Sequence, residues 1–211
     1  MPGIMGKRLT VHVRVPQPRL IAQAVETLRA GGVAVYPTDS CYALGCLPGD
    51  KAALERICRI RRLDARHNFT LACRDLSEIS LYARVSNPSF RLMKGLTPGP
   101  YTFILKATHE VPRRLQNVRR KTIGLRVPDN RIAQALLQAL GAPLMSTTLR
   151  LPDDDLPLTD PDEIEARLGE RVDVLVDGGC CGLESTTVID LADEIPVVAR
   201  VGCGDVSRIG G

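Results

Sequence analysis

The sequence predicts an α/β protein in which helices pack on one mixed, twisted sheet. The first observation is that strand-like and helix-like segments alternate along the 211 residues. The second is an ordinary globular composition, with 44% apolar and 25% charged residues. The third is that no apolar run approaches the roughly 20 residues needed to cross a bilayer. We therefore expect a single cytoplasmic domain over residues 1–211, with no membrane partner.

Strands are expected where short apolar or alternating runs end at turn residues. Leu9, Val11, Val13 and Val15 alternate with polar residues, which predicts a half-buried strand over 9–15. A short buried strand follows at 33–37 and runs into the loop PTDSCYALGC. The remaining strands are expected at 69–73, 102–107, 122–127, 143–148, 172–177, 186–191 and 196–201.

Helices are expected where an apolar stripe follows a capping signal. Pro18 opens the first helix, which a glycine pair ends. Asp50 begins a helix that extends to about residue 62, and Asp75 begins another. Further helices are expected over 87–95, 129–140 and 161–168.

Charge is distributed unevenly along the chain. Residues 1–150 hold 24 Lys and Arg against 9 Asp and Glu, a net charge of +15. Residues 151–211 hold 4 against 15, a net charge of −11. A positive working surface would select anionic partners such as phosphates, nucleotides or nucleic acid. The alternative is that the two segments neutralise each other across the folded molecule.

The seven cysteines do not predict a disulfide framework. Their number is odd, their spacing is irregular, and they form neither a Cys-x-x-Cys pair nor a cluster with histidine at zinc spacing. We expect free, mostly buried thiols and no metal held by protein side chains, the alternative being an adventitious soft-metal site. Cys41 is of interest because it lies in the loop after 33–37.

Hydroxyl and guanidinium groups at strand ends are the first functional candidates. The sequence has no Gly-x-Ser-x-Gly, Walker A, Gly-x-Gly-x-x-Gly or His-Glu-x-x-His motif. Thr122 and Arg126 lie on one face of a predicted strand, because strand side chains alternate. Such groups suit phosphate or carboxylate, although threonine also simply favours strands. The candidates are Thr38, Thr122, Arg126, Ser146, Thr147, Thr148, Thr186, Thr187 and Arg200.

Two arginine-rich segments, 56–66 and 113–121, are further candidates. Clusters of this kind contact the phosphate backbone of RNA or are merely solvated surface. Aromatic residues make up 3% of the chain, so any RNA would be bound through backbone charge and shape rather than by stacking. The second segment contains no acid, and its basic residues are Arg113, Arg114, Arg119, Arg120 and Lys121.

Several motifs resemble those of the YrdC-like family. GGVAVYPTDSCYALGC is similar to the family's opening signature, a strand that runs into a Pro-Thr-acidic loop. The likeness continues through TPGPYTFILK, TIGLRVP, PLMSTT, TTVIDL and RVGCGDV, and covers about residues 17–208. The segment HNFTLACRDLSE looks closest to the YciO branch. The extra C-terminal domain of longer relatives is not expected.

The resemblance implies a twisted α/β fold with a large concave, positively charged cleft. The best-known members of the family are threonylcarbamoyl-AMP synthases. They join L-threonine, bicarbonate and ATP, with Mg²⁺, and release pyrophosphate; their product feeds the modification of tRNA. Other members are described as binding double-stranded RNA or tRNA. No tightly bound cofactor is implied, since ATP and Mg²⁺ would be substrate and ion.

The resemblance also assigns roles by matching motif positions. Arg126 would bind the carboxylate of threonine. The threonine side of the cleft would otherwise be lined by Thr38, Ser146 and Thr186. The nucleotide side would hold Arg61, His67, Thr122, Thr148 and Arg200.

The chain departs from the synthase pattern at four polar catalytic positions and at the proline that follows the first pair. Synthases have Lys-x-Arg followed by Pro, where this chain has Arg61, Leu63 and Asp64, and Ser-x-Asn, where it has Thr148 and Arg150. Arginine does not replace lysine neutrally against phosphate. Leucine cannot stabilise charge on a phosphoryl group, and losing one such stabiliser typically costs about 10²–10³ in rate.

His67 and Arg150 would restore part of the missing positive charge. We therefore expect a protein that binds nucleotide or RNA, with weak or altered threonylcarbamoyl-AMP synthase activity. The alternative is a non-catalytic protein that binds double-stranded RNA or tRNA.

Overall fold

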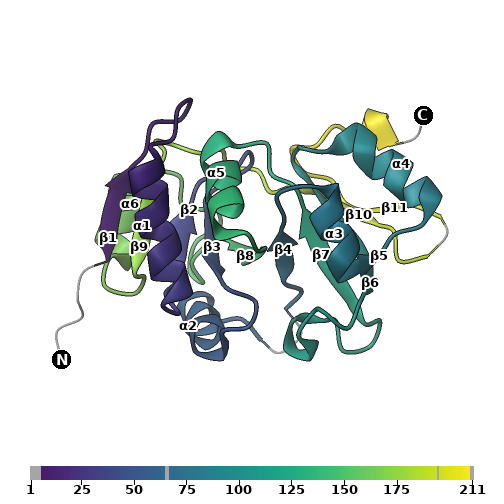
Figure 1. Cartoon of the computed structure of the whole chain (residues 1–211), viewed down its shortest axis with the longest axis horizontal. Helices are drawn as coiled ribbons and strands as arrows, with labels where there is room; N and C mark the ends of the chain where they lie inside the picture. The colour runs from purple at the N-terminus through teal and green to yellow at the C-terminus, as the bar shows by residue number, and fades with distance from the viewer. Residues whose placement is uncertain (1–5, 65–66, 194, 210–211) are drawn as a thin grey trace.

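The computed structural model describes residues 6–64, 67–193 and 195–209, and this part of the chain folds around one mixed sheet (Figure 1). Its strands are β1 (Lys7–Thr10), β2 (Ala34–Tyr36), β3 (Ala43–Cys46), β4 (Thr70–Ala72), β5 (Ala83–Arg84), β6 (Tyr101–Ala107), β7 (Thr122–Arg126), β8 (Leu144–Thr148), β9 (Val174–Asp177), β10 (Thr187–Asp190) and β11 (Val197–Arg200). The helices are α1 (Pro18–Arg29), α2 (Lys51–Arg61), α3 (Leu76–Tyr82), α4 (Asn87–Leu96), α5 (Arg131–Leu140) and α6 (Pro161–Leu168), with 3₁₀ turns η1 (Arg113–Leu115) and η2 (Val206–Ile209).

The strand order is β1-β9-β2-β3-β8-β4-β7-β6-β10-β11, with β5 beside β6. Four pairs are parallel, namely β1 with β9, β9 with β2, β4 with β7, and β6 with β10. The other pairs are antiparallel. The predicted mixed α/β sheet with packed helices is therefore confirmed.

Two apolar clusters hold the helices on the two faces of the sheet. On one face α1 and α5, which lie side by side in Figure 1, pack against alternate strand residues such as Ala43, Ala72 and Leu144. On the other face α2, α3, α4 and α6 share a cluster with Leu44 and Leu71. The apolar stripes read from the sequence are the faces buried in these clusters.

The predicted helix signals are confirmed. Pro18 is the first residue of α1, and Gly141 ends α5 in the left-handed conformation that glycine favours. The Asp50 side chain accepts from the Ala53 N–H at 2.9 Å, and the Asp75 side chain accepts from the Glu78 N–H at 2.8 Å. These bonds satisfy backbone donors that the first helical turn leaves free.

Strand β1 is shorter than the predicted strand over 9–15. It runs parallel to β9, and the pairing ends with Thr10 opposite Asp177, the last residue of β9. Beyond one more bond, from the Val11 N–H to the Asp177 carbonyl at 2.8 Å, the alternating residues continue outside the sheet. Val13 and Val15 are accordingly 53% and 70% exposed. The alternation of apolar and polar residues therefore predicts burial correctly for Leu9 and Val11, which lie beside β9, but not for Val13 and Val15.

Strands β3 and β5 were not predicted. β3 lies inside the expected loop after β2, where it is buried and pairs with β2 and β8. Its four residues, ALGC, have no alternation to signal a strand. β5 has two residues and pairs with the end of β6. Both exist because neighbouring strands supply hydrogen-bond partners that the local sequence does not encode.

Ion pairs join the basic and acidic parts of the chain. Arg8 contacts Asp162 at 2.6 Å and Glu165 at 2.8 Å, and Arg56 contacts Asp173 at 2.7 Å. Part of the uneven charge is therefore neutralised within the fold. Within the described part of the chain, no helix is long and apolar enough to cross a membrane.

Candidate functional site

A cavity of about 550 Å³ opens on one face of the sheet, beyond the end that α1 and α5 cover. The register brings its lining together: Ser146 on β8 lies opposite both Gly45 and Thr70, and Gly124 on β7 lies opposite Thr70 and Ile104. Alternate residues of adjacent strands thus face one space. The lining residues that lie on strands β3, β4, β6, β7, β8, β10 and β11 include Ala43, Thr70, Thr102, Ile104, Thr122, Gly124, Arg126, Ser146, Thr148, Val188 and Arg200.

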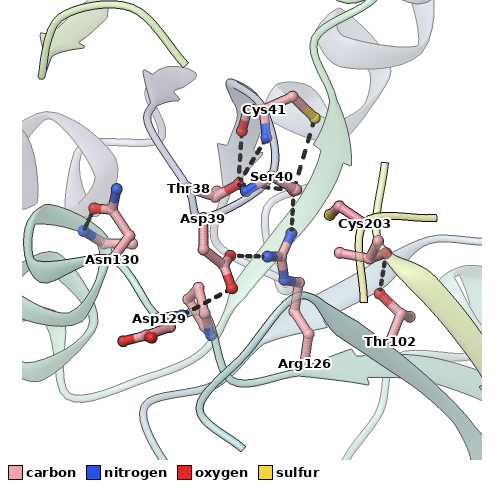
Figure 2. A network of polar contacts seen from close by, with 12 residues as sticks. Thr38, Asp39, Ser40, Cys41, Thr102, Arg126, Asp129, Asn130 and Cys203 are labelled. Carbon is pink, nitrogen blue, oxygen red and sulfur yellow. Dashed lines mark hydrogen bonds and ion pairs between the residues drawn. The ribbon is translucent and has the colours of Figure 1, made fainter. Parts of the chain in front are cut away.

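Arg126, the last residue of β7, forms a buried ion pair with Asp39 (Figure 2). Its Nη2 contacts Asp39 Oδ1, and its Nη1 donates to Ser40 Oγ at 3.3 Å. Asp39 Oδ2 in turn accepts from the Asp129 N–H at 3.0 Å, and both charged side chains are 9% exposed. The buried Nε of Arg126 has no hydrogen-bond partner among the described residues. Arg126 is therefore held firmly while one donor remains available.

Thr38 shapes the loop that presents these groups. Its hydroxyl donates to the Cys41 carbonyl at 2.6 Å and accepts from the backbone N–H groups of Ser40 and Cys41 at 3.2 and 3.3 Å (Figure 2). Thr38 is buried and is not among the residues that line the cavity. Its observed contacts are those of a residue that orders the loop, and they fully engage its hydroxyl.

Two hydroxyl pairs lie along the cavity. Tyr36 donates to Ser146 Oγ at 2.8 Å, and burial raises the pKa of Tyr36, so this phenol keeps its proton. Thr102 and Thr186 share a hydrogen bond of 2.8 Å. Arg200 Nη2 donates to the Thr186 carbonyl at 2.9 Å. The structure thus brings Ser146 on β8, Thr186 immediately before β10 and Arg200 on β11 to one cavity.

At the other side of the cavity, Arg61 is fixed by the end of β8. Its Nη1 donates to Thr147 Oγ1 at 2.8 Å and to the Thr148 carbonyl at 2.6 Å. Its buried Nε has no hydrogen-bond partner in the described part of the chain. Burial, reinforced by the charge of Arg150, lowers the pKa of Arg61. A guanidinium remains protonated nonetheless, because its ordinary pKa is so high.

His67 shares Thr147 with Arg61. Its Nε2 lies 3.2 Å from Thr147 Oγ1, and its ring meets Phe69 edge-on with centroids 5.0 Å apart. Burial lowers the pKa of His67, and the positive charge of Arg61 lowers it further. Because Thr147 accepts a hydrogen bond from Arg61, its own proton is free to point to a neutral His67.

The four positions that depart from the synthase pattern separate in space. Arg61, Thr148 and Arg150 all line the cavity. Leu63 instead packs against the apolar cluster under the sheet, and its N–H donates to the Cys58 carbonyl at 2.9 Å. Leu63 thus packs in the apolar core, whereas the charged side chain of Arg150 lines the cavity.

The basic segment 113–121 connects β6 to β7 at the edge of the cavity. Its candidates Arg113, Arg114, Arg119, Arg120 and Lys121 are all exposed. Arg120 lines the cavity but pairs with Asp190 and Asp193, and Arg114 donates to the carbonyls of Pro48 and Gly49. Within the described residues, the side chains of Arg113, Arg119 and Lys121 have no ion pair. Arg66, in the other arginine-rich segment, lies outside the described residues.

All seven cysteines are free, as expected, and Cys41 lines the cavity. The expectation that most of them are buried is wrong, because Cys41, Cys46 and Cys73 alone are buried and Cys180 is exposed. Burial raises the pKa of Cys181 to about 12, so this thiol stays protonated. Residues 6–64, 67–193 and 195–209 contain no group of three or more His, Cys, Asp or Glu side chains that could hold a metal ion.

Asp39 and Thr102 are site residues that the sequence reasoning missed. Asp39 follows Thr38 in a motif that was noticed, but nothing local shows that its carboxylate meets Arg126, 87 residues away. The sequence indicates Thr102 only weakly, because strand alternation places it on the same face as Ile104. The positions of both Asp39 and Thr102 in the site depend on pairing between distant segments of the chain.

Fold and cavity together define an α/β protein with a polar, arginine-lined space of the size of a small ligand. The family model for Sua5, YciO and YrdC, described as "Telomere recombination", matches residues 26–202. The chain therefore belongs to the Sua5/YciO/YrdC family. The resemblance read from the sequence is confirmed.

Three relatives show where the chain lies within this family. It is 61% identical over 202 residues to "Uncharacterized protein YciO" of Escherichia coli K12, covering 96% of this chain and 98% of that protein. The E. coli YciO crystal structure superposes with a TM-score of 0.93 at 60% identity, covering 97% of this chain and all of that one. A threonylcarbamoyl-AMP synthase of Thiobacillus denitrificans is 35% identical over 167 residues, covering 78% and 87%.

The third relative, after E. coli YciO and the synthase of Thiobacillus denitrificans, is P. abyssi Sua5 complexed with L-threonine, and it shares the fold. It superposes with a TM-score of 0.85 at 24% identity, covering 93% of this chain and 57% of that one. The chain is thus a YciO-type member of a family that also contains threonylcarbamoyl-AMP synthases.

Proposed function

We propose that this protein binds a nucleotide in the cavity and performs threonylcarbamoyl-AMP synthase chemistry weakly or in altered form. The observation that supports this proposal is the gathering of Arg61, Arg126 and Arg200 with the hydroxyls of Ser146 and Thr186 around one space. Guanidinium forks recognise phosphate and carboxylate oxygens, and the hydroxyls add neutral donors.

The two ends of the cavity suit two different anionic groups. At the Arg126 end, the free Nε and the hydroxyl of Ser146 suit the carboxylate of an amino acid such as L-threonine. At the Arg61 end, the free Nε and Arg150 suit phosphate oxygens. A nucleotide would also contact Thr122, Thr148 and Arg200, which line the same cavity.

Two features explain why the chemistry would be weak. Leu63 lies in the apolar cluster and supplies no charge where synthases have arginine. Arg61 already donates to Thr147 and Thr148, so part of its fork is committed to the protein. Each missing stabiliser of a transferring phosphoryl group typically costs about 10²–10³ in rate.

Pyrophosphate release from ATP, L-threonine and bicarbonate with Mg²⁺ tests the enzymatic proposal. We expect slow release that depends on threonine and is lost in Arg126→Met, which keeps the bulk of the side chain without its charge. Arg59→Ala, an exposed position in α2 outside the cavity lining, is the matched control and should leave the rate unchanged. No threonine-dependent release at high enzyme concentration would remove the synthase proposal.

Binding of double-stranded RNA or tRNA is the second candidate function. The observation that favours it is the exposed basic segment 113–121 beside the cavity, in which Arg113, Arg119 and Lys121 have no ion pair among the described residues. These cations are free to contact phosphates, whereas Arg120 is engaged by Asp190 and Asp193.

RNA affinity at different salt concentrations tests the second candidate. It should fall steeply between 50 and 200 mM salt, and Arg113→Glu with Arg119→Glu should weaken it more than Arg120→Glu does alone. Arg91→Glu, at an exposed position of α4 outside both arginine-rich segments, controls for a general change of charge. Affinity that does not depend on salt would contradict this candidate.

A further inference from the structure

Two arginines without a carboxylate partner face the same side of the cavity. Arg61 lies at the end of α2 and Arg150 follows β8, and both line the cavity. Neither forms an ion pair with a carboxylate in residues 6–64, 67–193 and 195–209. Two guanidinium groups in one space repel each other, and a ligand that brings at least two negative charges relieves this repulsion.

Arg61 is oriented before any ligand arrives. The bonds from its Nη1 to Thr147 and Thr148 fix the plane of the fork, and its buried Nε is left without a partner in the described structure. A buried donor without a partner costs free energy that an acceptor from a ligand would recover. The arginine is therefore a preformed half of an anion site.

Arg150 supplies the other half. Its backbone N–H donates to the Thr148 carbonyl at 3.0 Å, which turns the chain at the end of β8. Its side chain is exposed and reaches the cavity from the rim. The charge of Arg150 contributes to lowering the pKa of Arg61, which agrees with the two groups lying close enough to interact.

Acidic residues nearby are mostly committed elsewhere. Asp153 pairs with Arg62 at 3.4 Å, and Asp154 pairs with Arg167 at 2.9 Å. Among the described residues that line the cavity, Asp155 is the single carboxylate. It stands against five arginines, namely Arg61, Arg120, Arg126, Arg150 and Arg200.

This donor set does not fit a Mg²⁺ held by the protein, although the family's synthases use that ion. Mg²⁺ requires several oxygen ligands and is usually bound by one or two carboxylates together with phosphates. Arginine offers donors but no acceptor, so a cation among these side chains would be repelled. The side chains themselves supply the positive charge that Mg²⁺ would otherwise supply.

We propose that Arg61 and Arg150 together bind a dianionic phosphate or pyrophosphate group directly, without a divalent cation between protein and ligand. This inference rests on the proposed nucleotide site and specifies its phosphate end. A planar fork on each side of the group allows paired N–H···O bonds to its oxygens. Arg150, which stands where synthases have asparagine, thereby adds a positive charge that neutralises phosphate oxygens directly.

Calorimetric titration of the whole protein with inorganic pyrophosphate tests this proposal, in EDTA and in 5 mM Mg²⁺. We expect binding in EDTA that Mg²⁺ leaves unchanged or weakens. Arg150→Ala should weaken it by roughly 10- to 100-fold, as expected for charge-assisted hydrogen bonds. Arg59→Ala removes the same charge from an exposed site outside the cavity and should change affinity by less than about twofold.

Opposite results overturn the proposal in recognisable ways. Binding that requires Mg²⁺ and is lost in Asp155→Asn would show a metal held by Asp155. Binding that Arg150→Ala and Arg59→Ala weaken equally would show general charge attraction. In both cases the nucleotide site itself would stand. If neither pyrophosphate nor ATP bound with or without Mg²⁺, the proposed function would fail together with this inference.

Discussion

Asp39 and Arg126 neutralise each other inside the protein, where little water is available to replace either partner. Removing one member of a buried pair leaves an uncompensated charge, which typically costs 3–5 kcal/mol. We expect Asp39→Ala to lower the free energy of unfolding, measured with urea, by about 3 kcal/mol or more. Asp39→Ala combined with Arg126→Met should recover part of this loss, because no charge is left buried.

The exposed pair of Arg62 and Asp153 provides the matched control. These side chains are 71% and 80% exposed, and such pairs contribute about 0–1 kcal/mol. Asp153→Ala should therefore have a small effect. Equal losses in Asp39→Ala and Asp153→Ala would show that the Asp39 pair is not isolated from water.

His67 predicts how stability changes with pH. Its pKa is lowered in the fold from an ordinary value of 6.5, mainly by burial and further by Arg61. As pH falls below 6.5, the unfolded chain therefore binds a proton before the folded chain does, and the free energy of unfolding decreases. The decrease stops once the pH is below the lower, folded pKa.

His67→Gln isolates this effect from the carboxylates. The wild type should be more stable than the variant at pH 7.5, and the difference should narrow as the pH falls to 5.5. Urea unfolding at the two pH values measures it. A difference that grows on acidification would mean that the fold favours the protonated imidazole instead.

For single residues, the sequence shows which side chains share one face of a strand but not which side chains from distant strands are in contact. Alternation places Thr122 and Arg126 on one face, and both line the cavity. No pattern places Asp39 against Arg126 or Leu63 in the core, because these contacts depend on how distant strands pair.

Helix α5 depends on a side-chain cap that the structure makes visible. Asn130 Oδ1 accepts from the N–H groups of Ile132 and Ala133, both at 3.0 Å. We expect Asn130→Ala to lower the free energy of unfolding by about 1 kcal/mol, whereas Asn130→Asp, which preserves the acceptor, should change it much less. Thermal or urea unfolding of the three proteins measures this, and equal losses in both variants would contradict a capping role.

Elements with strong local signals were predictable, and those defined by partners were not. Helices α1, α2 and α5 follow the end signals Pro18, Asp50 and Gly141 and their apolar stripes. The limits of β1 follow from where β9 ends, and β3 is a strand because β2 and β8 lie beside it. Hydrogen-bond partners far away in the sequence thus set the boundaries of the short strands.

Across the whole molecule, attraction between the basic and acidic segments contributes to stability. The pairs of Arg8 with Asp162 and Glu165, and of Arg56 with Asp173, join the two segments. Salt screens exposed charges beyond roughly 10 Å at 0.1 M. We expect the free energy of unfolding to fall by about 1–2 kcal/mol between 0.05 and 0.5 M NaCl.

Urea unfolding at the two salt concentrations measures this fall. Arg8→Gln should show a smaller fall, because it removes three ion pairs with the acidic segment, those with Asp162, Glu165 and Asp177. Stability that is constant or rises with NaCl would show that repulsion within each segment outweighs attraction between them.

The cavity is assembled from residues as far apart in the chain as Cys41 and Arg200. A partly folded chain that has not yet placed β11 beside β10 lacks part of the binding surface, so occupancy reports on completed folding. A ligand that binds only the folded protein raises its free energy of unfolding by about 2.7 kcal/mol at a concentration one hundred times the dissociation constant, and so raises the melting temperature. Measuring the melting temperature with a series of small anions is therefore a direct way to find the natural ligand.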